Sequence, residues 1–111
     1  MRAALVWMCA AGLVGLGSVV VHAGAQEYDP VRDGHALVTM YCSDCHATEA
    51  IGDSPLPLAP LFRELHLRYD VELLSEALVE GIVTTHPEMP QFEFDPDQAA
   101  AIVAYLKSLE P

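Results

Sequence analysis

The residues of this chain most able to do chemistry lie at positions 42 to 46, in the sequence Cys42-Ser43-Asp44-Cys45-His46. Two thiols three residues apart at the end of a helix lie on one face, where both can add to the two vinyl groups of one porphyrin. The adjacent histidine then directs its imidazole at the central iron. Because C-x-x-C-H is the attachment motif of c-type haem, the sequence predicts one covalent haem c, bound by Cys42 and Cys45 with His46 as an iron ligand.

Paired cysteines have two other common uses, structural zinc binding and thiol–disulfide exchange. A structural zinc site needs four nitrogen or sulfur ligands. Beyond position 25 the chain has only Cys42 and Cys45, and His46 is too close to them to complete a tetrahedral set. A thioredoxin-like dithiol needs a βαβ context, and no segment here alternates convincingly between apolar and polar residues. Both alternatives explain the sequence less well than haem.

Three helices are predicted to position this motif, so the expected fold class is all-α. Asp-Pro pairs at Asp29 and Asp95 combine a capping side chain with a proline at the first helical position, and a further helix is expected after Asp70. The proline-bearing segments 51–60 and 84–94 between them are expected to be irregular. Residues at helical spacing are Val31, His35, Val38 and Cys42; Val71, Leu73, Leu74, Ala77, Leu78 and Ile82; and Ala99, Ile102, Val103, Leu106 and Leu109.

The first 25 residues are predicted to be an export signal. Residues 26–111, which follow it, are predicted to form one domain. Arg2 is positively charged, residues 3–21 carry no charge, and Ala23-Gly24-Ala25 supplies small residues before a cut at Gln26. The apolar stretch is long enough that an uncleaved membrane anchor is the alternative. Cys9 lies inside this stretch and is expected to leave with it. The mature protein is therefore expected in the periplasm, and in contact with a membrane only if the segment is retained.

The charge of the chain restricts its partners. The 111 residues include 16 acidic and 5 basic side chains, and the 86 residues from 26 to 111 keep all 16 acids but only 4 basic groups, a formal charge of −12. Nucleic acid, whose phosphates require Lys and Arg, is a poor candidate partner. A body of this size also gains from a cofactor that adds buried apolar surface, because a small core supplies only a few kcal/mol.

Beyond the haem motif, the chain resembles the class I cytochrome c family over about residues 29–109, most closely its short bacterial members. Gly34, eight residues before Cys42, resembles the small residue at which the family's terminal helices cross, and Ile102, Tyr105 and Leu106 resemble the apolar face laid across it. The resemblance implies a cytochrome c fold of three main helices with haem-wrapping loops. Two positions depart from the family pattern: Ala59 replaces the commoner glycine, and Val38 stands where an aromatic residue often packs.

The resemblance also implies two further haem contacts. Ala59-Pro60-Leu61 resembles the stretch whose proline carbonyl accepts the N–H of the proximal imidazole, although Pro57 is a rival for that role. Met89-Pro90 resembles the distal ligand motif, which would give the iron a soft thioether ligand. His86 is the main competitor of Met89, whereas Met40 is too close to Cys42 to reach the opposite haem face. The aromatic residues expected in the haem pocket and helix contacts are Tyr41, Phe62, Tyr69, Phe92, Phe94 and Tyr105.

Iron with a protein ligand on both faces has no position open to substrate, which predicts electron transfer and no enzymatic activity. The expected partners are redox proteins with basic docking surfaces. The chain is expected to act as a monomeric carrier or, alternatively, as a permanently bound haem subunit of a periplasmic dehydrogenase or oxidase. Ligand-binding chemistry, in a sensor or a peroxidase, would require that Met89 be absent from the iron.

Overall fold

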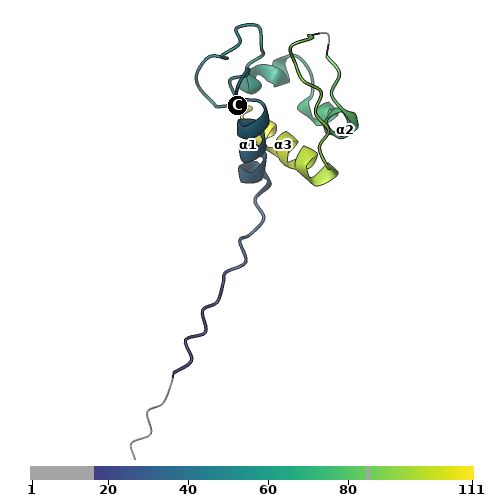
Figure 1. The fold of residues 1–111 in the computed structure, drawn as a ribbon. Coiled ribbons are helices and arrows are strands. Elements are labelled where there is room, and N and C mark those ends of the chain that lie inside the picture. The colour runs from purple at the N-terminus through teal and green to yellow at the C-terminus, as the bar shows by residue number, and fades with distance from the viewer. Residues whose placement is uncertain (1–16, 85) are drawn as a thin grey trace, which may run out of the picture.

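The computed structural model describes residues 17–84 and 86–111, and within them it contains helices and irregular segments but no strand. The all-α fold expected from the sequence is therefore confirmed. Residues 17–29 are exposed and extend away from the helices (Figure 1). The elements, in chain order, are α1 (Pro30–Tyr41), η1 (Phe62–Leu67), η2 (Val71–Leu73), α2 (Leu74–Glu80) and α3 (Pro96–Ser108), where η marks a 3₁₀ helix.

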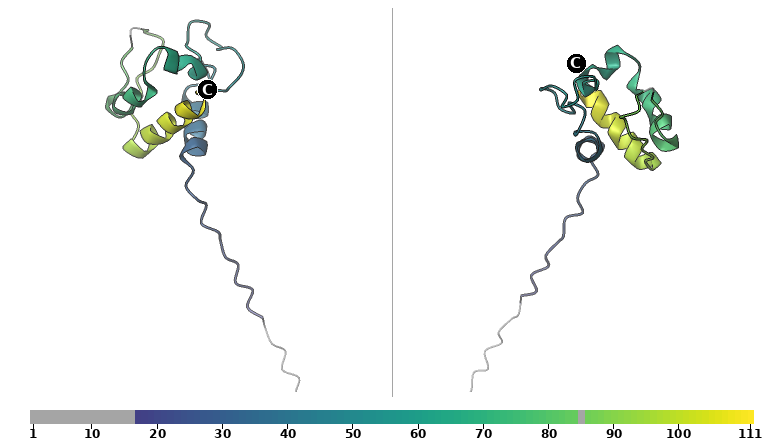
Figure 2. Two further views of the ribbon diagram at one scale, coloured as in Figure 1. Left: turned by 180° about the vertical axis from the view of Figure 1, so that it is seen from behind. Right: turned by 45° about the horizontal axis from the view of Figure 1, so that its top comes forward.

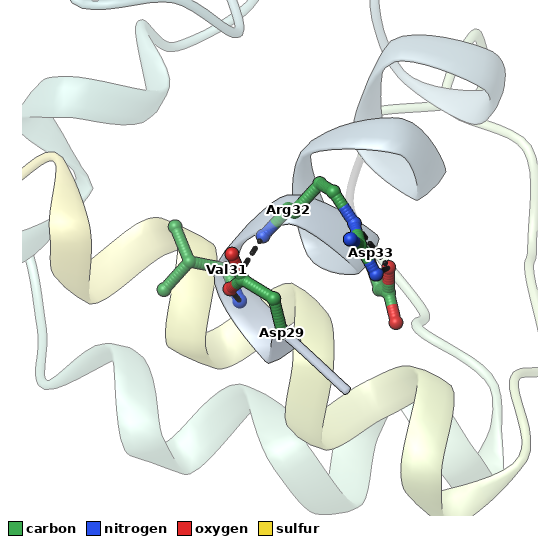
Figure 3. Close-up of polar contacts among 4 residues, drawn as sticks. All are labelled: Asp29, Val31, Arg32 and Asp33. Carbon is green, nitrogen blue, oxygen red and sulfur yellow. Dashed lines mark hydrogen bonds and ion pairs between the residues drawn. The ribbon is translucent and has the colours of Figure 1, made fainter. Parts of the chain in front are cut away.

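The helix α1 begins where the sequence predicts, because Asp29 caps it. The Asp29 Oδ1 atom accepts hydrogen bonds from the backbone N–H groups of Val31, at 3.1 Å, and Arg32, at 3.2 Å (Figure 3). A cap of this kind stabilises a helix by about 1 kcal/mol. The neighbouring ion pair between Arg32 and Asp33, 3.0 Å long, is exposed on both sides and contributes little.

The helix α3 begins with a reciprocal cap. The Asp95 side chain accepts from the backbone N–H of Gln98 at 2.8 Å, and the Gln98 side chain accepts from the backbone N–H of Asp95 at 3.2 Å. Two otherwise unpaired donors of the first turn are satisfied in this way. The predicted start of the C-terminal helix is confirmed, and the helix ends one residue before Leu109.

The second predicted helix differs from expectation in its first turn. Asp70 accepts from the backbone N–H of Glu72 at 3.0 Å, and the chain continues as the 3₁₀ turn η2 before α2 begins. With three residues per turn, Val71 and Leu74 face the core while Leu73 is 71% exposed, so the prediction that Leu73 belongs to the apolar stripe is wrong. Gly81, with φ of +99°, ends α2 in a conformation that favours glycine.

The most extensive contact between two elements of the described residues lies between α1 and α3. At Gly34, which is buried, an added Cβ would overlap the backbone carbonyl oxygen of Ala101 and lie 2.9 Å from Cβ of Tyr105. Backbone atoms cannot rotate away as a side-chain end can. The predicted crossing at Gly34, against the face containing Ile102, Tyr105 and Leu106, is therefore what the structure has.

Two irregular loops project on the same side of this helix crossing (Figure 1; Figure 2, left). Tyr41, at the end of α1, packs against Phe92 and Phe94 of the second loop. One loop joins α1 to η1 and includes residues 43–61; the other joins α2 to α3 and includes residues 81–95. The core beneath them centres on Val38, Val71 and Ala99, each 0–1% exposed. Among residues 17–84 and 86–111, no helix is long and apolar enough to cross a membrane. The predicted leader falls largely on residues 1–16, outside the described residues.

We expect Gly34→Ala to destabilise the fold by about 1–3 kcal/mol, because the new methyl group meets the Ala101 carbonyl. The loss should appear despite the roughly 1 kcal/mol that alanine gains over glycine in helix propensity. Thermal unfolding of the purified variant measures it. Ala36→Gly, at an exposed position of the same helix, is the control that isolates propensity alone. A Gly34→Ala protein more stable than wild type would contradict the close crossing.

Candidate cofactor site

The two loops and the end of α1 enclose a cavity of about 370 Å³ whose walls are mostly apolar. A separate, shallower depression lies between α3 and the segment formed by η2 and α2. Residues that line the cavity are Met40, Tyr41, Cys42, Asp44, Cys45, His46, Leu56, Leu58, Ala59, Pro60, Phe62, His86, Glu88, Met89, Pro90 and Phe92. All five residues predicted from the sequence to bind the cofactor therefore meet in one cavity.

The paired cysteines reach the cavity because the chain continues to turn after α1. Cys42 caps the helix, and its carbonyl oxygen accepts from the backbone N–H groups of Cys45, at 3.2 Å, and His46, at 2.9 Å. Both thiols are free and half-buried. Burial, together with the charge of Cys45, raises the pKa of Cys42 to about 11. Since a thiol–disulfide exchange nucleophile needs a lowered pKa, this environment disfavours the dithiol alternative.

The imidazole of His46 is held in one orientation. Its Nδ1 atom lies 2.7 Å from the carbonyl oxygen of Pro60, which can only accept, so Nδ1 carries the proton and Nε2 is the nitrogen able to bind a metal. The ring of Phe62 packs against the imidazole with a centroid distance of 4.9 Å. Pro57, the rival considered from the sequence, is exposed and does not line the cavity. A carbonyl behind the ring also strengthens donation by the opposite nitrogen.

Backbone hydrogen bonds fold the first loop around His46. Leu56 N–H donates to the carbonyl of Cys45 at 3.1 Å, and Phe62 N–H donates to the carbonyl of Ala47 at 3.0 Å. The Ser54 hydroxyl accepts from the N–H of Ala47 at 2.9 Å. These bonds join the start of the loop to its end, so the loop is fixed although it contains no regular helix. Sequence periodicity gives no signal for such contacts, nor for η1, which follows them.

A second anchor ties this loop to α3. The hydroxyl of Tyr105 donates to the buried carbonyl of Thr48 at 2.7 Å, two residues after His46. Burial first, and then the nearby carboxylate of Glu49, raises the pKa of Tyr105 to about 12, so the hydroxyl keeps its proton across the neutral range. His35, for which the sequence suggested no role, lies 2.6 Å from Glu49 and packs its ring against Tyr105.

The second loop, between α2 and α3, forms another part of the cavity wall. From position 83 to 90, Met89 is half-buried and every other described residue is exposed. His86 also lines the cavity, and its carbonyl accepts from the N–H of Met89 at 3.2 Å. Tyr41, Phe92 and Phe94 pack edge to face or tilted beside this loop, 5.4–6.0 Å apart. Tyr69, expected among the pocket or helix contacts, is 40% exposed and does not line the cavity.

The residues that line the cavity suit a flat apolar cofactor that contains its own metal ion. No three His, Cys, Asp or Glu side chains among the described residues gather into a metal site, which leaves zinc without ligands. The cavity instead combines apolar walls, two thiols on one side, an oriented imidazole and a thioether from the other loop. That combination fits a porphyrin better than a bare ion.

The fold and this cavity define a small c-type cytochrome, and comparison with known proteins gives the same answer. Residues 29–106 match the family described as cytochrome c oxidase, cbb3-type, subunit III, and the chain belongs to this family of c-type cytochrome domains. It is 31% identical over 81 residues to cytochrome c-552 of Bradyrhizobium diazoefficiens, a match that covers 70% of this chain and 73% of that protein. No solved structure matches the chain significantly. The protein therefore carries covalently bound haem c and has a role in electron transfer.

We expect the haem to remain with the polypeptide after denaturation and extraction with acidic organic solvent, because thioether bonds survive this treatment. Changing Cys42 or Cys45 to Ser should lower the yield of haem-containing protein, and changing both should leave the domain poorly folded. Cys9→Ser is the control, since Cys9 lies in the expected leader. Haem that leaves with the solvent from the wild-type protein would contradict covalent attachment.

Proposed function

We propose that this cytochrome is an exported, periplasmic carrier of single electrons that holds one haem at Cys42 and Cys45, with His46 and Met89 as axial ligands. The observation that supports this most directly is the single cavity that collects all four side chains from the end of α1 and from two loops. When bound, the haem iron supplies a one-electron change of oxidation state. One C-x-x-C-H sequence in the chain supports a single haem.

The proposed ligands have complementary effects on the iron. His46, whose Nδ1 donates to the Pro60 carbonyl, is the more basic ligand because that hydrogen bond increases electron density on the ring. Met89 offers a soft sulfur that favours the ferrous state and raises the reduction potential. Together they would hold the iron from both sides. No position is then left for dioxygen or peroxide, so electron transfer through the cavity edge is the function that this arrangement supports, and not an enzymatic reaction.

The cavity mouth carries negative charge, which supports a basic partner. Asp44 and Glu88 line the cavity, whereas neither Lys nor Arg does so among the described residues. Elsewhere, Lys107 pairs with Glu72 at 2.6 Å, and Arg63 donates to the carbonyl of Gly52 at 2.8 Å. A redox protein with a basic docking surface would therefore be attracted to this face and reach the haem edge by the shortest route.

The family description favours a second candidate: a haem subunit held permanently in an oxidase complex. Exposed apolar side chains at the cavity rim, Met40 at 72% and Leu58 at 76% exposure, are compatible with such a contact. Co-purification with larger subunits would support it, and a stable soluble monomer would support the carrier. In both cases the predicted leader, residues 1–25, directs export; cleavage after Ala25 would leave a carrier of residues 26–111, and retention would leave it anchored.

Ligation by Met89 is tested in the absorption spectrum of the purified protein. We expect the ferric protein to show the weak far-red charge-transfer band of sulfur-ligated haem, and the ferrous protein not to bind carbon monoxide readily. Met89→Leu should abolish that band and lower the reduction potential, because a soft ligand has been removed. Met40→Leu is the matched control and should change neither. A wild-type protein that binds carbon monoxide at once would contradict closed ligation.

Basic docking is tested by the salt dependence of electron transfer to a basic redox protein. Exposed charges are screened beyond about 8–10 Å at ordinary ionic strength, so the association rate should fall by about tenfold or more between low and physiological salt. Asp44→Asn with Glu88→Gln should weaken both the rate and its salt dependence. Glu76→Gln with Glu80→Gln removes the same charge from the exposed face of α2 and should have a smaller effect. Rates that do not respond to salt would contradict electrostatic docking.

A further inference from the structure

The second loop brings two possible iron ligands to the same cavity. Among the cavity-lining residues, those with a nitrogen or sulfur able to bind iron are Met40, Cys42, Cys45, His46, His86 and Met89. The first four come from α1 and the haem-binding motif that follows it. His86 and Met89 alone come from the loop between α2 and α3, which faces the cavity from the other direction.

A single turn separates His86 from Met89. The N–H of Met89 donates to the carbonyl of His86 at 3.2 Å, so the two residues are the first and last members of the same hydrogen-bonded turn. His86 is itself fastened to the loop, because its N–H donates to the Thr84 hydroxyl and its carbonyl accepts from that hydroxyl, both at 3.2 Å. One short turn therefore carries both side chains, and exchange of one for the other would involve a rearrangement of this turn.

Burial ranks the two groups. Met89 is half-buried and His86 is exposed. A thioether loses little by leaving water, whereas an imidazole gives up hydrogen bonds to solvent. The residues from 83 to 90 are otherwise exposed where described, and exposed segments open locally at low free-energy cost. In the structure, therefore, Met89 is the more buried of the two cavity-lining residues and His86 is the more exposed.

We propose that His86 is a reserve axial ligand, which binds the iron when the sulfur of Met89 is lost and so keeps the distal position closed. This inference rests on the proposed ligation by His46 and Met89 and extends it. Imidazole and thioether are both established haem ligands, and imidazole gives the lower potential. The consequence is a carrier that stays closed to small ligands even when its primary distal ligand fails.

The test compares haem-loaded Met89→Leu with Met89→Leu/His86→Ala. The single variant should lose the sulfur band yet keep the spectrum of a six-coordinate low-spin haem, and the double variant should be high-spin. If His86 occupies the position at least nine-tenths of the time, carbon monoxide should bind the single variant at least about tenfold more weakly than the double variant. Met89→Leu/Val83→Ala, at an exposed position of the same loop that does not line the cavity, is the matched control and should behave as the single variant.

Added imidazole provides an independent measurement on the same proteins. It should bind the double variant and restore the spectrum of Met89→Leu, while far-ultraviolet circular dichroism verifies that each variant is folded. If both variants are equally open to carbon monoxide, or both stay closed, His86 is not the reserve ligand and the inference is overturned. Those results leave the sulfur band of the wild-type protein intact, whereas absence of that band in wild type would overturn the ligation by Met89 on which the inference rests.

Discussion

The close contact of Gly34 with the Ala101 carbonyl is the constraint on which the remaining structure depends. It allows α1 and α3 to approach until backbone meets backbone, and this crossing fixes where the C-terminal end of α1 lies. The haem-binding motif begins at that end, at Cys42, so the position of the thiols follows from a contact two helical turns away. A side chain at Gly34 would separate the helices and displace the motif relative to everything that packs on α3.

The cavity itself is built from irregular chain that hydrogen bonds hold in place. The bond from His46 to Pro60 joins the two ends of the first loop, and the bond from Tyr105 to the Thr48 carbonyl fastens that loop to α3. Among the described residues of the second loop, the bonds around Met89 are local: its N–H donates to the carbonyl of His86, and His86 bonds the Thr84 hydroxyl. One wall of the site is thus firmly positioned and the other is able to rearrange. This difference suits a protein whose proximal ligand must stay fixed while its distal contacts adapt.

Much of this protein was determined by local sequence alone. The caps at Asp29 and Asp95 fix the starts of α1 and α3, because a carboxylate acceptor and a following proline act within one turn. The C-x-x-C-H motif predicted haem c, because haem attachment depends on five consecutive residues. Gly34 was identifiable through its spacing to Cys42, although only as a resemblance to a family. The family membership and the all-α fold were predictable for these reasons.

Tertiary structure decided what depends on residues far apart in the chain. The choice of Pro60 over Pro57 as the partner of His46 required the loop to close, and the exposure of Leu73 required η2 to have three residues per turn, which the helical pattern did not indicate. The sequence favoured Met89 over His86 only through a resemblance to a family, since both residue types bind iron, and the tertiary structure is what leaves Met89 half-buried and His86 exposed. Local propensities act over a few residues, whereas these outcomes depend on which backbone carbonyls and apolar surfaces the packed helices bring within reach.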